Sequence, residues 1–534
     1  MSSRLIRRTR SVRGSSPKAP VPAPIIGNYF EFWLPIGARR PKPNLPELVP
    51  KKKSGASASA SAPSPTTPPP PSDTPFQFLK AHFEPTKTSP FGAKSTFGTK
   101  GDGYKAISRV QFIRAGVELG YGPRKTWNSA FAFSGTAGPE LARHLLLRLQ
   151  SIMSCLEQST DGSWKPRKFY DKIEASEKVA ISFVLGSIFS FHAADMWLSA
   201  AGDGLQLFLH TGLYTKAIVD SEERVKYSSS TKQRPDFIVL SQQGHWSLFE
   251  SKGGTWNKKW GQLYKGLRQL QGGPSIGWES DATLVEPQAC VCTYTEVDTA
   301  KPLKTTAIDP PEDDFPTFPD AGEPNSEVTK LVFVKGVIQL MVILQAIDQY
   351  RAMAADAVDD GSSEPKPNET WIATETRRFE GLLVGIPVGH LRLEPKIRAT
   401  LACYFIVQEF VEERRFSKPS RFNYEREQLG DAVVNRIEKL ESSDEAIQQA
   451  RLLASKLNNV RDGKERVFLA DDSIFKDCAN YLGIEELAET LMGDIREMRS
   501  IFELLNSPNF ERVVTSGGLL LLEGAHHNRR EEQS

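Results

Sequence analysis

The stretch RPDFIVLSQQGHWSLFESKGG, from Arg234 to Gly254, decides the fold. Its two halves, Pro235 to Leu240 and Trp246 to Lys252, are rich in β-branched and aromatic residues, which is typical of strands. Between them lies Gln242-Gln243-Gly244, and glycine supplies the positive φ that a three-residue hairpin loop needs. The stretch therefore predicts a β-hairpin.

Counting outward from the turn predicts the register of this hairpin. Leu240 pairs with Trp246, and Asp236 then pairs with Glu250. Directly opposed carboxylates have Cβ atoms roughly 5 Å apart, and at an effective dielectric of about 20 they repel by roughly 3 kcal/mol. A divalent cation between them removes that cost. Lys252 follows Glu250 by two residues and so shares its face. Two oxygen ligands beside a cation suit metal-assisted attack of water on a phosphodiester.

Pro235-Asp236 and Glu250-Ser251-Lys252, joined by a hairpin, resemble the signature of the PD-(D/E)XK nuclease superfamily. The resemblance covers roughly Glu177 to Tyr294 and implies a restriction-endonuclease-like mixed sheet flanked by helices, in an α/β (α+β) chain. It implies that Asp236, Glu250 and the Ser251 carbonyl hold Mg²⁺, for which Mn²⁺ can substitute. Lys252 would orient or deprotonate the attacking water and stabilise the developing charge. The alternative is a surface hairpin with a solvated Glu-x-Lys pair.

The next segment, Asn257 to Gln271, has the spacing of a helix. Gln262, Lys265 and Gln269 follow one of its faces at intervals of three and four residues. The resemblance implies that Gln262 and Lys265 lie beside the metal, and the alternative is that they are ordinary exposed polar residues. Recombination nucleases carry a Tyr four positions after the Gln, where this chain has Gly266, so we assign no subgroup.

Three further segments complete the expected core. Ala175 to Ala201 is a long apolar helical run, Leu205 to Tyr214 is a plausible first strand, and Gln288 to Thr295 is apolar enough for a buried strand. The resulting order is a helix, three strands, a helix and a strand. The resemblance implies an additional acidic metal ligand on the first helix, with Glu177 the leading candidate and Asp195 the second. Both are also consistent with exposed helix charges.

Composition sets the outer bounds. A chain of 534 residues with 39% hydrophobic and 25% charged residues predicts two or three globular domains. Five cysteines without a CxxC pair argue against a disulfide framework or zinc finger, so we expect a reducing cytoplasm. Cys290 and Cys292 are interpreted as core residues. The net charge of +2 gives no global signature of nucleic-acid binding. Basic residues do cluster near the proposed site: Lys252, Lys258, Lys259, Lys265 and Arg268.

The flanking regions differ in kind. The N-terminal tip is basic, and no apolar run follows it to make a secretory signal. A Ser/Ala/Pro tract then predicts a linker, and the aromatic segment Ile25 to Ile36 could dock. Val328 to Met353 is apolar but interrupted by polar residues, so a buried helix is favoured over a membrane span. The predicted regions are residues 1–74, a disordered basic and Pro-rich tail and linker; 75–166, an N-terminal accessory region; 167–300, the nuclease-like core; 301–327, an acidic Pro-rich linker; and 328–534, a mainly helical C-terminal region.

Within the C-terminal region the pattern predicts several elements. Phe379 to Leu393 looks extended and could pair as strands, and Val513 to Glu523 predicts a closing hairpin. Amphipathic helices are predicted over Lys396 to Arg415, Leu429 to Asn458 and Ser473 to Leu505.

Two functions follow as hypotheses. The first is a Mg²⁺-dependent nuclease, endo- or exonucleolytic, that hydrolyses DNA. The second is a catalytically inactive nuclease-fold protein that binds nucleic acid or serves as a scaffold in a defence, mobile-element or repair complex. DNA is the expected partner, with protein partners possible through the N-terminal tail and the C-terminal helices, and no membrane is expected. RNA is the less favoured substrate.

Overall fold

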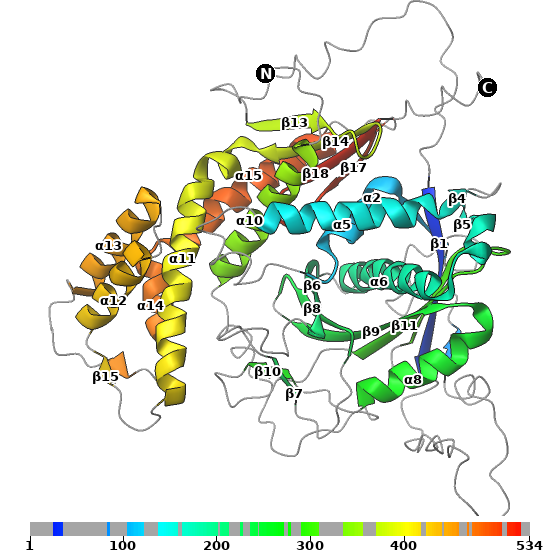
Figure 1. Ribbon diagram of the computed structural model, residues 1–534, viewed down its shortest axis with the longest axis horizontal. Coiled ribbons are helices and arrows are strands. Elements are labelled where there is room, and N and C mark those ends of the chain that lie inside the picture. Colours follow the sequence, from blue (N-terminus) through cyan, green and yellow to red (C-terminus); the bar gives the residue numbers. More distant parts are fainter. Residues whose placement is uncertain are drawn as a thin grey trace, which may run out of the picture.

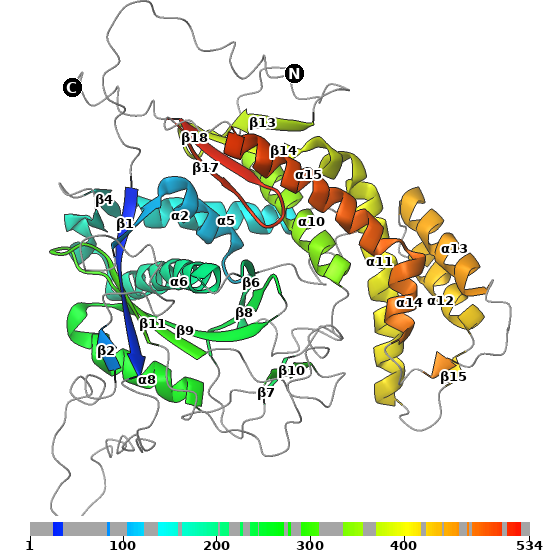
Figure 2. The same ribbon diagram turned by 180° about the vertical axis from the view of Figure 1, so that it is seen from behind.

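The computed structural model describes the chain in separate stretches. They form a mixed sheet flanked by helices and, beside it, a mainly helical part with a smaller sheet (Figures 1 and 2). The described residues are 25–35, 83–85, 104–121, 137–158, 163–200, 203–212, 225–227, 235–243, 245–271, 276–278, 290–308, 335–355, 370–417, 423–424, 426–439, 443–458, 467–468, 473–504 and 510–524.

The larger sheet has the strand order β2-β1-β12-β11-β9-β8-β6, and β3 also pairs with β1. The β9–β11 and β1–β12 pairs are parallel, whereas its other pairs are antiparallel. Mixed α/β architecture is therefore confirmed. The strands are β1 (Ile25–Pro35), β2 (Phe83–Pro85), β3 (Tyr104–Ser108), β6 (Leu205–His210), β8 (Phe237–Ser241), β9 (Trp246–Gly254), β11 (Cys290–Glu296) and β12 (Lys304–Ile308).

The hairpin of β8 and β9 has the predicted register. Leu240 lies opposite Trp246, and Phe237 lies opposite Phe249, which places Asp236 opposite Glu250. Next to the turn, the Ser241 amide donates to the His245 carbonyl at 2.9 Å. Gly244, predicted to form the turn, lies outside the described residues. β9 continues past the start of β8 because it pairs with β11 as far as Gly254.

Two helices cover the two faces of the sheet beside this hairpin. They are α6 (Ala175–Ala200) and α8 (Lys259–Gln271). α6 lies against the backbone of β9, since a Cβ at Gly186 would lie only 3.1 Å from the Lys252 carbonyl oxygen, and one at Gly253 would collide with the Ser182 carbonyl. On α8 three leucines turn inward and are buried: Leu263, Leu267 and Leu270.

A further helical layer lies on the outer side of α6, so the layers run α2 and α5, α6, the sheet, and α8 (Figures 1 and 2). α2 spans Arg109–Glu118 and begins with a capping box between Ser108 and Gln111. α5 spans Ala137–Ser154. The smaller elements here are β4 (Leu156–Gln158), β5 (Trp164–Pro166), η1 (Lys168–Lys172), β7 (Val225–Tyr227), η2 (Trp256–Lys258) and β10 (Ile276–Trp278).

The C-terminal part packs helices on a four-stranded antiparallel sheet of order β13-β14-β18-β17. The predicted helix over residues 429–458 is two helices, and the one over 473–505 is broken at Gly483, where φ is +64°. The elements are α10 (Lys335–Ala354), β13 (Trp371–Glu375), β14 (Leu382–Pro387), α11 (Val388–Ser417), β15 (Asn423–Tyr424), α12 (Arg426–Lys439), α13 (Asp444–Asn458), β16 (Val467–Phe468), α14 (Ser473–Tyr481), α15 (Ile484–Leu504), β17 (Phe510–Val514) and β18 (Leu520–Gly524).

Three features depart from the predicted boundaries. β1 lies inside the region predicted as a tail, and β12 lies inside the region predicted as a linker; the two pair with each other at one side of the sheet. The segment predicted as extended over Phe379 to Leu393 is strand β14 followed directly by α11. A strand and a fully buried helix start present similar apolar runs, so periodicity alone did not separate them.

α10 is a buried core helix, as predicted, with Val337, Leu340 and Ile347 fully inaccessible. Among the described residues one helix, Ala175–Ser199, is long and apolar enough to cross a membrane by length and composition, and 72% of its apolar window is buried in the protein.

Candidate functional site

Two carboxylates and a lysine meet where β8 begins and β9 continues beyond it. Glu250 is completely buried, whereas the Asp236 and Lys252 side chains keep 26% and 20% of their exposure. Lys252 Nζ lies 3.4 Å from Asp236 Oδ2 and contacts Glu250 Oε1 directly. The structure thus brings together the three residues that the hairpin predicted, and the cluster retains an open side.

Backbone amides orient both carboxylates. The Asp236 amide donates to Glu250 Oε2 at 2.9 Å, and the Ser251 amide donates to Asp236 Oδ2 at 3.1 Å. The Thr211 amide holds the Asp236 carbonyl at 3.0 Å. These donors are available because β8 starts only at Phe237, so the backbone at 236 and 251 is free to bond side chains. The carboxylates are therefore preorganised rather than freely rotating.

Burial dominates the electrostatics of the site. Burial, followed by the neighbouring Asp236, raises the pKa of Glu250 to about 8 against the opposing effects of Lys252 and the Asp236 amide. Burial lowers the pKa of Lys252, but the carboxylates of Glu250 and Asp236 outweigh it, so that pKa lies above its usual value. Lys252 therefore stays cationic at neutral pH, and the Glu250 carboxyl releases its proton less readily than a free glutamate.

α8 approaches the buried carboxylate through a glycine. A Cβ at Gly266 would lie 3.1 Å from Glu250 Cγ and would collide with Cys292 Sγ. Gln262 lies one turn earlier on the same side of α8 and is half-buried, while Lys265 is exposed. Both predicted residues thus belong to the helix that faces Glu250, with Gln262 the better placed.

The predicted acidic ligand on the first helix does not reach this cluster. Glu177 is exposed in the first turn of α6, and Asp195 pairs with Arg114 at 3.5 Å. α6 covers the opposite face of the sheet, because a Cβ at Gly186 would lie 3.3 Å from Ser251 Oγ, which projects away from Glu250. In the described part of the chain no three His, Cys, Asp or Glu side chains form a metal-holding group.

The donors that do meet fit a hard cation. Mg²⁺ in proteins is commonly held by one or two carboxylates, with water and substrate phosphate oxygens completing its shell. Asp236 and Glu250 supply the carboxylates, and the Ser251 carbonyl is adjacent in the chain. Burial raises the pKa of the neighbouring Cys292 thiol well above its ordinary value. Cys290 and Cys292 are both buried, as predicted.

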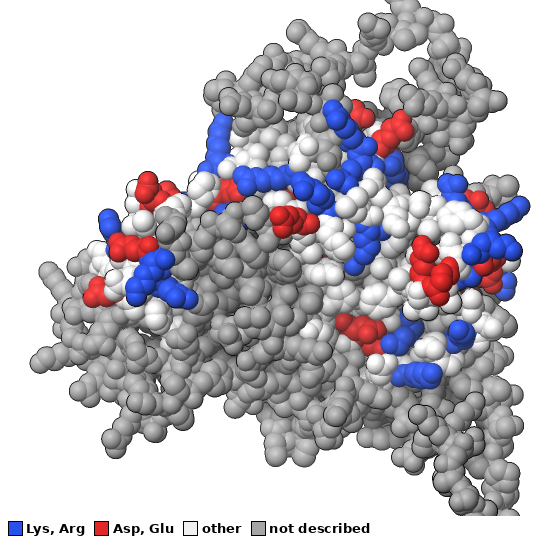
Figure 3. All heavy atoms as spheres, in the orientation of Figure 1, with Lys and Arg blue, Asp and Glu red and all other residues white. Residues whose placement is uncertain are grey.

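The local basic patch is smaller than predicted. Lys259 is buried and pairs with Glu296 at 3.0 Å, so it holds α8 to the sheet instead of facing solvent. Lys258 and Lys265 remain exposed. The face drawn in Figure 3 intersperses Lys and Arg with Asp and Glu over its described part, in keeping with the small net charge.

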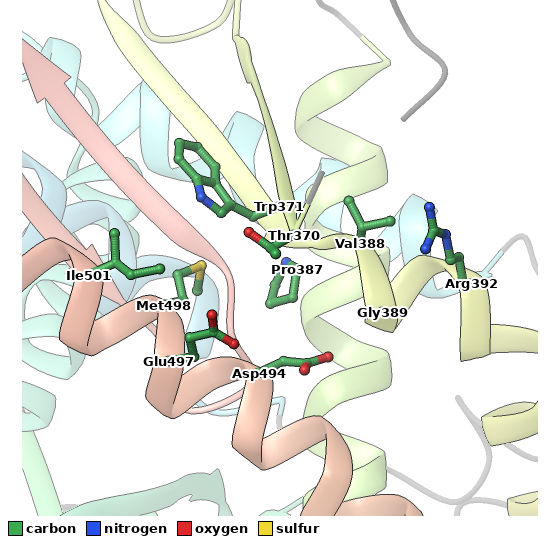
Figure 4. Close-up of a pocket in the computed structure, with 10 residues that line it drawn as sticks. All are labelled: Thr370, Trp371, Pro387, Val388, Gly389, Arg392, Asp494, Glu497, Met498 and Ile501. Atoms are coloured by element: carbon green, nitrogen blue, oxygen red, sulfur yellow. The ribbon is translucent and has the colours of Figure 1, made fainter. Parts of the chain in front are cut away.

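A separate cavity of about 330 Å³ lies in the C-terminal part. Figure 4 shows it between Trp371 of β13, the start of α11 and the side chains of α15. Asp494 abuts the first turn of α11, since a Cβ at Gly389 would collide with its carboxylate, and burial raises the pKa of Asp494. None of the residues of the carboxylate–lysine cluster lines this cavity.

Sequence reasoning missed Thr211 and Gly266 as parts of this region. Only Gly266 left a signal, a glycine inside an otherwise helical pattern. Comparison with protein-family models, curated proteins and solved structures finds no match to this chain. The function is therefore inferred from the geometry of the site.

Proposed function

We propose that this protein is a Mg²⁺-dependent nuclease that hydrolyses phosphodiester bonds of DNA. The observation that carries the proposal is the meeting of Asp236, Glu250 and Lys252 in one preorganised, partly buried cluster. A purely structural hairpin gains nothing from opposing two carboxylates, because their repulsion costs on the order of kilocalories per mole.

Each residue of the cluster then has a role. Bound Mg²⁺ would lower the pKa of a water and draw charge from the phosphate oxygens. Asp236 and Glu250 would hold it, with the Ser251 carbonyl as a third oxygen. Lys252, already beside both carboxylates, would orient the attacking water and stabilise the charge that develops on the phosphate. Gln262 would hydrogen-bond the water or a phosphate oxygen from α8, and Lys265 would hold the substrate backbone.

One observation favours the second hypothesis, a nuclease fold that only binds DNA or serves as a scaffold. Lys252 already bridges the two carboxylates as an internal ion pair. The cluster is therefore satisfied in part without any metal, as a site that had lost turnover would be.

Cleavage of supercoiled plasmid, linear duplex and single-stranded DNA with Mg²⁺ or Mn²⁺ tests the proposal. The parent should cleave, and Lys252→Ala and Glu250→Gln should each lose at least about a hundredfold in rate, the usual cost of removing an essential charge or proton-transfer group. Lys456→Ala, an exposed lysine on α13, is the matched control and should cleave like the parent.

A metal-dependent rise in melting temperature separates the two hypotheses, since a ligand that binds only the folded state stabilises it. Mn²⁺ should raise the melting temperature of the parent but not that of Asp236→Asn. A folded parent that neither cleaves DNA nor responds to metal would refute the nuclease and favour the scaffold.

A further inference from the structure

The cavity between β13, α11 and α15 has an acidic end and an apolar end. Four residues on one face of α15 line it: Asp494, Glu497, Met498 and Ile501. Along that face the two carboxylates come first and the two apolar side chains follow. In Figure 4 the indole of Trp371 lies toward the Ile501 end, away from Asp494. Glu497 is exposed, so a molecule from solvent can reach the acidic end.

The carboxylates at the acidic end have no cationic partner in the described part of the chain. Burial, followed by the like charge of Glu497, raises the pKa of Asp494, and no cation opposes this shift. The arginines of the same stretch of α15 are engaged elsewhere, since Arg496 pairs with Glu489 at 2.5 Å and Arg499 donates to a backbone carbonyl at 3.2 Å. The acidic end therefore keeps a negative charge that no described side chain pairs with.

Two other features of the cavity do not account for this charge. Asp494 lies beside the first turn of α11, where the helix dipole favours a carboxylate, but that position explains one acidic residue and not two. Arg392 is the only cationic side chain among the described residues that line the cavity. It is exposed, it is not among the charges that shift the pKa of Asp494, and in Figure 4 it lies beyond Gly389 from both carboxylates. The described lining is thus net negative.

The apolar end suits a flat or aliphatic group. The ring of Trp371 packs edge-on against Phe502, with centroids 5.3 Å apart and an interplanar angle of 63°. Met498 and Val388 are 3% and 1% exposed, so they present a fixed apolar surface. Indole is the aromatic side chain whose face attracts cations most strongly, and the cavity of about 330 Å³ has the size of a small-molecule site.

We propose that this cavity binds a small aromatic amine. Its ammonium group lies between Asp494 and Glu497 and donates charge-assisted hydrogen bonds to them, while its ring packs on Trp371 and Met498. A metal ion is the other cation that two carboxylates can hold, but it needs about six oxygen ligands, and the indole and the thioether supply none. The site shares no residue with the carboxylate–lysine cluster, so the inference does not depend on the proposed nuclease function.

Three probes of one shape and different charge test this by isothermal titration calorimetry with the full chain. Phenethylamine, 2-phenylethanol and 3-phenylpropanoate carry the same ring and linker with a positive, a neutral and a negative end. Phenethylamine should bind with a Kd of about 1 mM or tighter. The alcohol should bind at least about tenfold more weakly, because hydrogen bonds to charged groups are the stronger ones, and the anion should not bind. Ethylamine, which lacks the ring, should also bind at least about tenfold more weakly than phenethylamine.

Substitutions in the cavity assign the two ends. Asp494→Asn and the more exposed Glu497→Gln should each weaken the binding of phenethylamine by about tenfold and leave that of the alcohol unchanged. Trp371→Leu should weaken the binding of both. Glu489→Gln is the matched control, since Glu489 is an exposed carboxylate on α15 outside the cavity, and it should bind every probe like the parent. Urea midpoints of all four variants show that each remains folded.

Several outcomes would overturn the proposal. They are a parent that does not bind phenethylamine, equal affinities for the amine and the alcohol, and equal losses in Asp494→Asn and Glu489→Gln. N-acetyl-lysine amide presents the same ammonium group as a protein side chain would. If it binds more tightly than phenethylamine, the occupant is a basic side chain of a protein partner and the aromatic amine is refuted. Cleavage of DNA by the parent, or its absence, bears on the nuclease alone.

Discussion

Gly266 is the residue at which α8, β9 and β11 come together around the buried carboxylate. Its missing side chain leaves room for Cys292 Sγ and Glu250 Cγ. A helix interior normally disfavours glycine by about 1 kcal/mol relative to alanine, so its presence here is explained by the close approach. A large side chain at position 266 would therefore not fit between Cys292 and Glu250 in this chain.

Gly266→Ala should therefore destabilise the protein, by about 1–3 kcal/mol of overpacking less the gain in helix propensity. Most of the collision is with the sulfur, so the same substitution in a Cys292→Ala background should be nearly neutral or stabilising. Urea unfolding of the parent, both single variants and the double variant measures the coupling. Additive effects would show that the close approach of Gly266 and Cys292 has no energetic consequence.

The site is predictable at this scale only where the strand period applies. Asp236, Glu250 and Lys252 follow from the loop length and the two-residue alternation of one hairpin, which involve only local geometry. To judge whether Glu177 can be a ligand, one must know which side of the sheet α6 covers. No local sequence pattern contains that information. Two other contacts likewise join distant elements. The Thr211 amide bonds the Asp236 carbonyl, and the buried Lys259 pairs with Glu296.

At the scale of elements, α10 and α11 are joined by a buried ion network. Arg398 donates to Asp348 at 2.9 Å and to Glu394 at 2.8 Å, and Arg351 also contacts Glu394. Arg398, Asp348 and Glu394 are all buried. Burial raises the pKa of Asp348 to about 6 even though Arg398 opposes the shift. The charges of the buried carboxylates are therefore balanced only while Arg398 is present.

Arg398→Met should cost about 3–5 kcal/mol, because it leaves two buried carboxyl groups without their main partner. Arg451→Met is the matched control, since Arg451 pairs with Glu438 at 3.0 Å but is 67% exposed, and it should change stability by less than about 0.5 kcal/mol. Chemical unfolding of the two variants measures the difference. Similar small effects would mean that the buried carboxyls simply take up protons.

Element types were easier to predict than element ends. The amphipathic patterns over residues 429–458 and 473–505 identified helices correctly, but each span contains a turn that the apolar spacing continues across. The break at Gly483 left a recognisable signal, a glycine in the left-handed region. β1 could not be predicted as a sheet strand, because its partner β12 is more than 250 residues away.

At the scale of the whole molecule, the two parts are connected by charged and polar contacts across their boundary. Arg109 of α2 pairs with the buried Glu523 of β18 at 2.5 Å, and Glu118 accepts from the Ser516 amide at 3.1 Å. Gln349 of α10 also donates to the Val117 carbonyl at 3.0 Å. Destabilising one part should therefore lower the stability of the other.

His390 allows this to be tested with pH. The side chain is completely buried in the C-terminal part, and burial lowers its pKa to about 4, with only partial opposition from the Leu491 carbonyl. Between pH 6.5 and 4 the unfolded chain binds the proton more readily, so stability is intact above pH 6.5 and falls with pH below it. At pH 5 the loss from this residue should be about 2 kcal/mol.

Urea midpoints of the parent and His390→Gln at pH 7.5 and pH 5 measure this, and the variant should lose less than the parent on acidification. The urea midpoint reported by the fluorescence of Trp246, on β9, should change with pH in the same way as the midpoint reported by a signal from the C-terminal part. A parent and variant with identical acid sensitivity would contradict the assignment, and an acid-insensitive β9 would contradict the coupling between the two parts.

The glycines at which α6 lies on β9 have a mechanical consequence. No side chain separates the two backbones at Gly186 and Gly253, so there is no soft layer to absorb a displacement of one against the other. A shift of the helix is passed directly to the peptide of Lys252. The ammonium group of that lysine is thus positioned by α6 as well as by the strands of the sheet, and a displacement of α6 would move that charge with it.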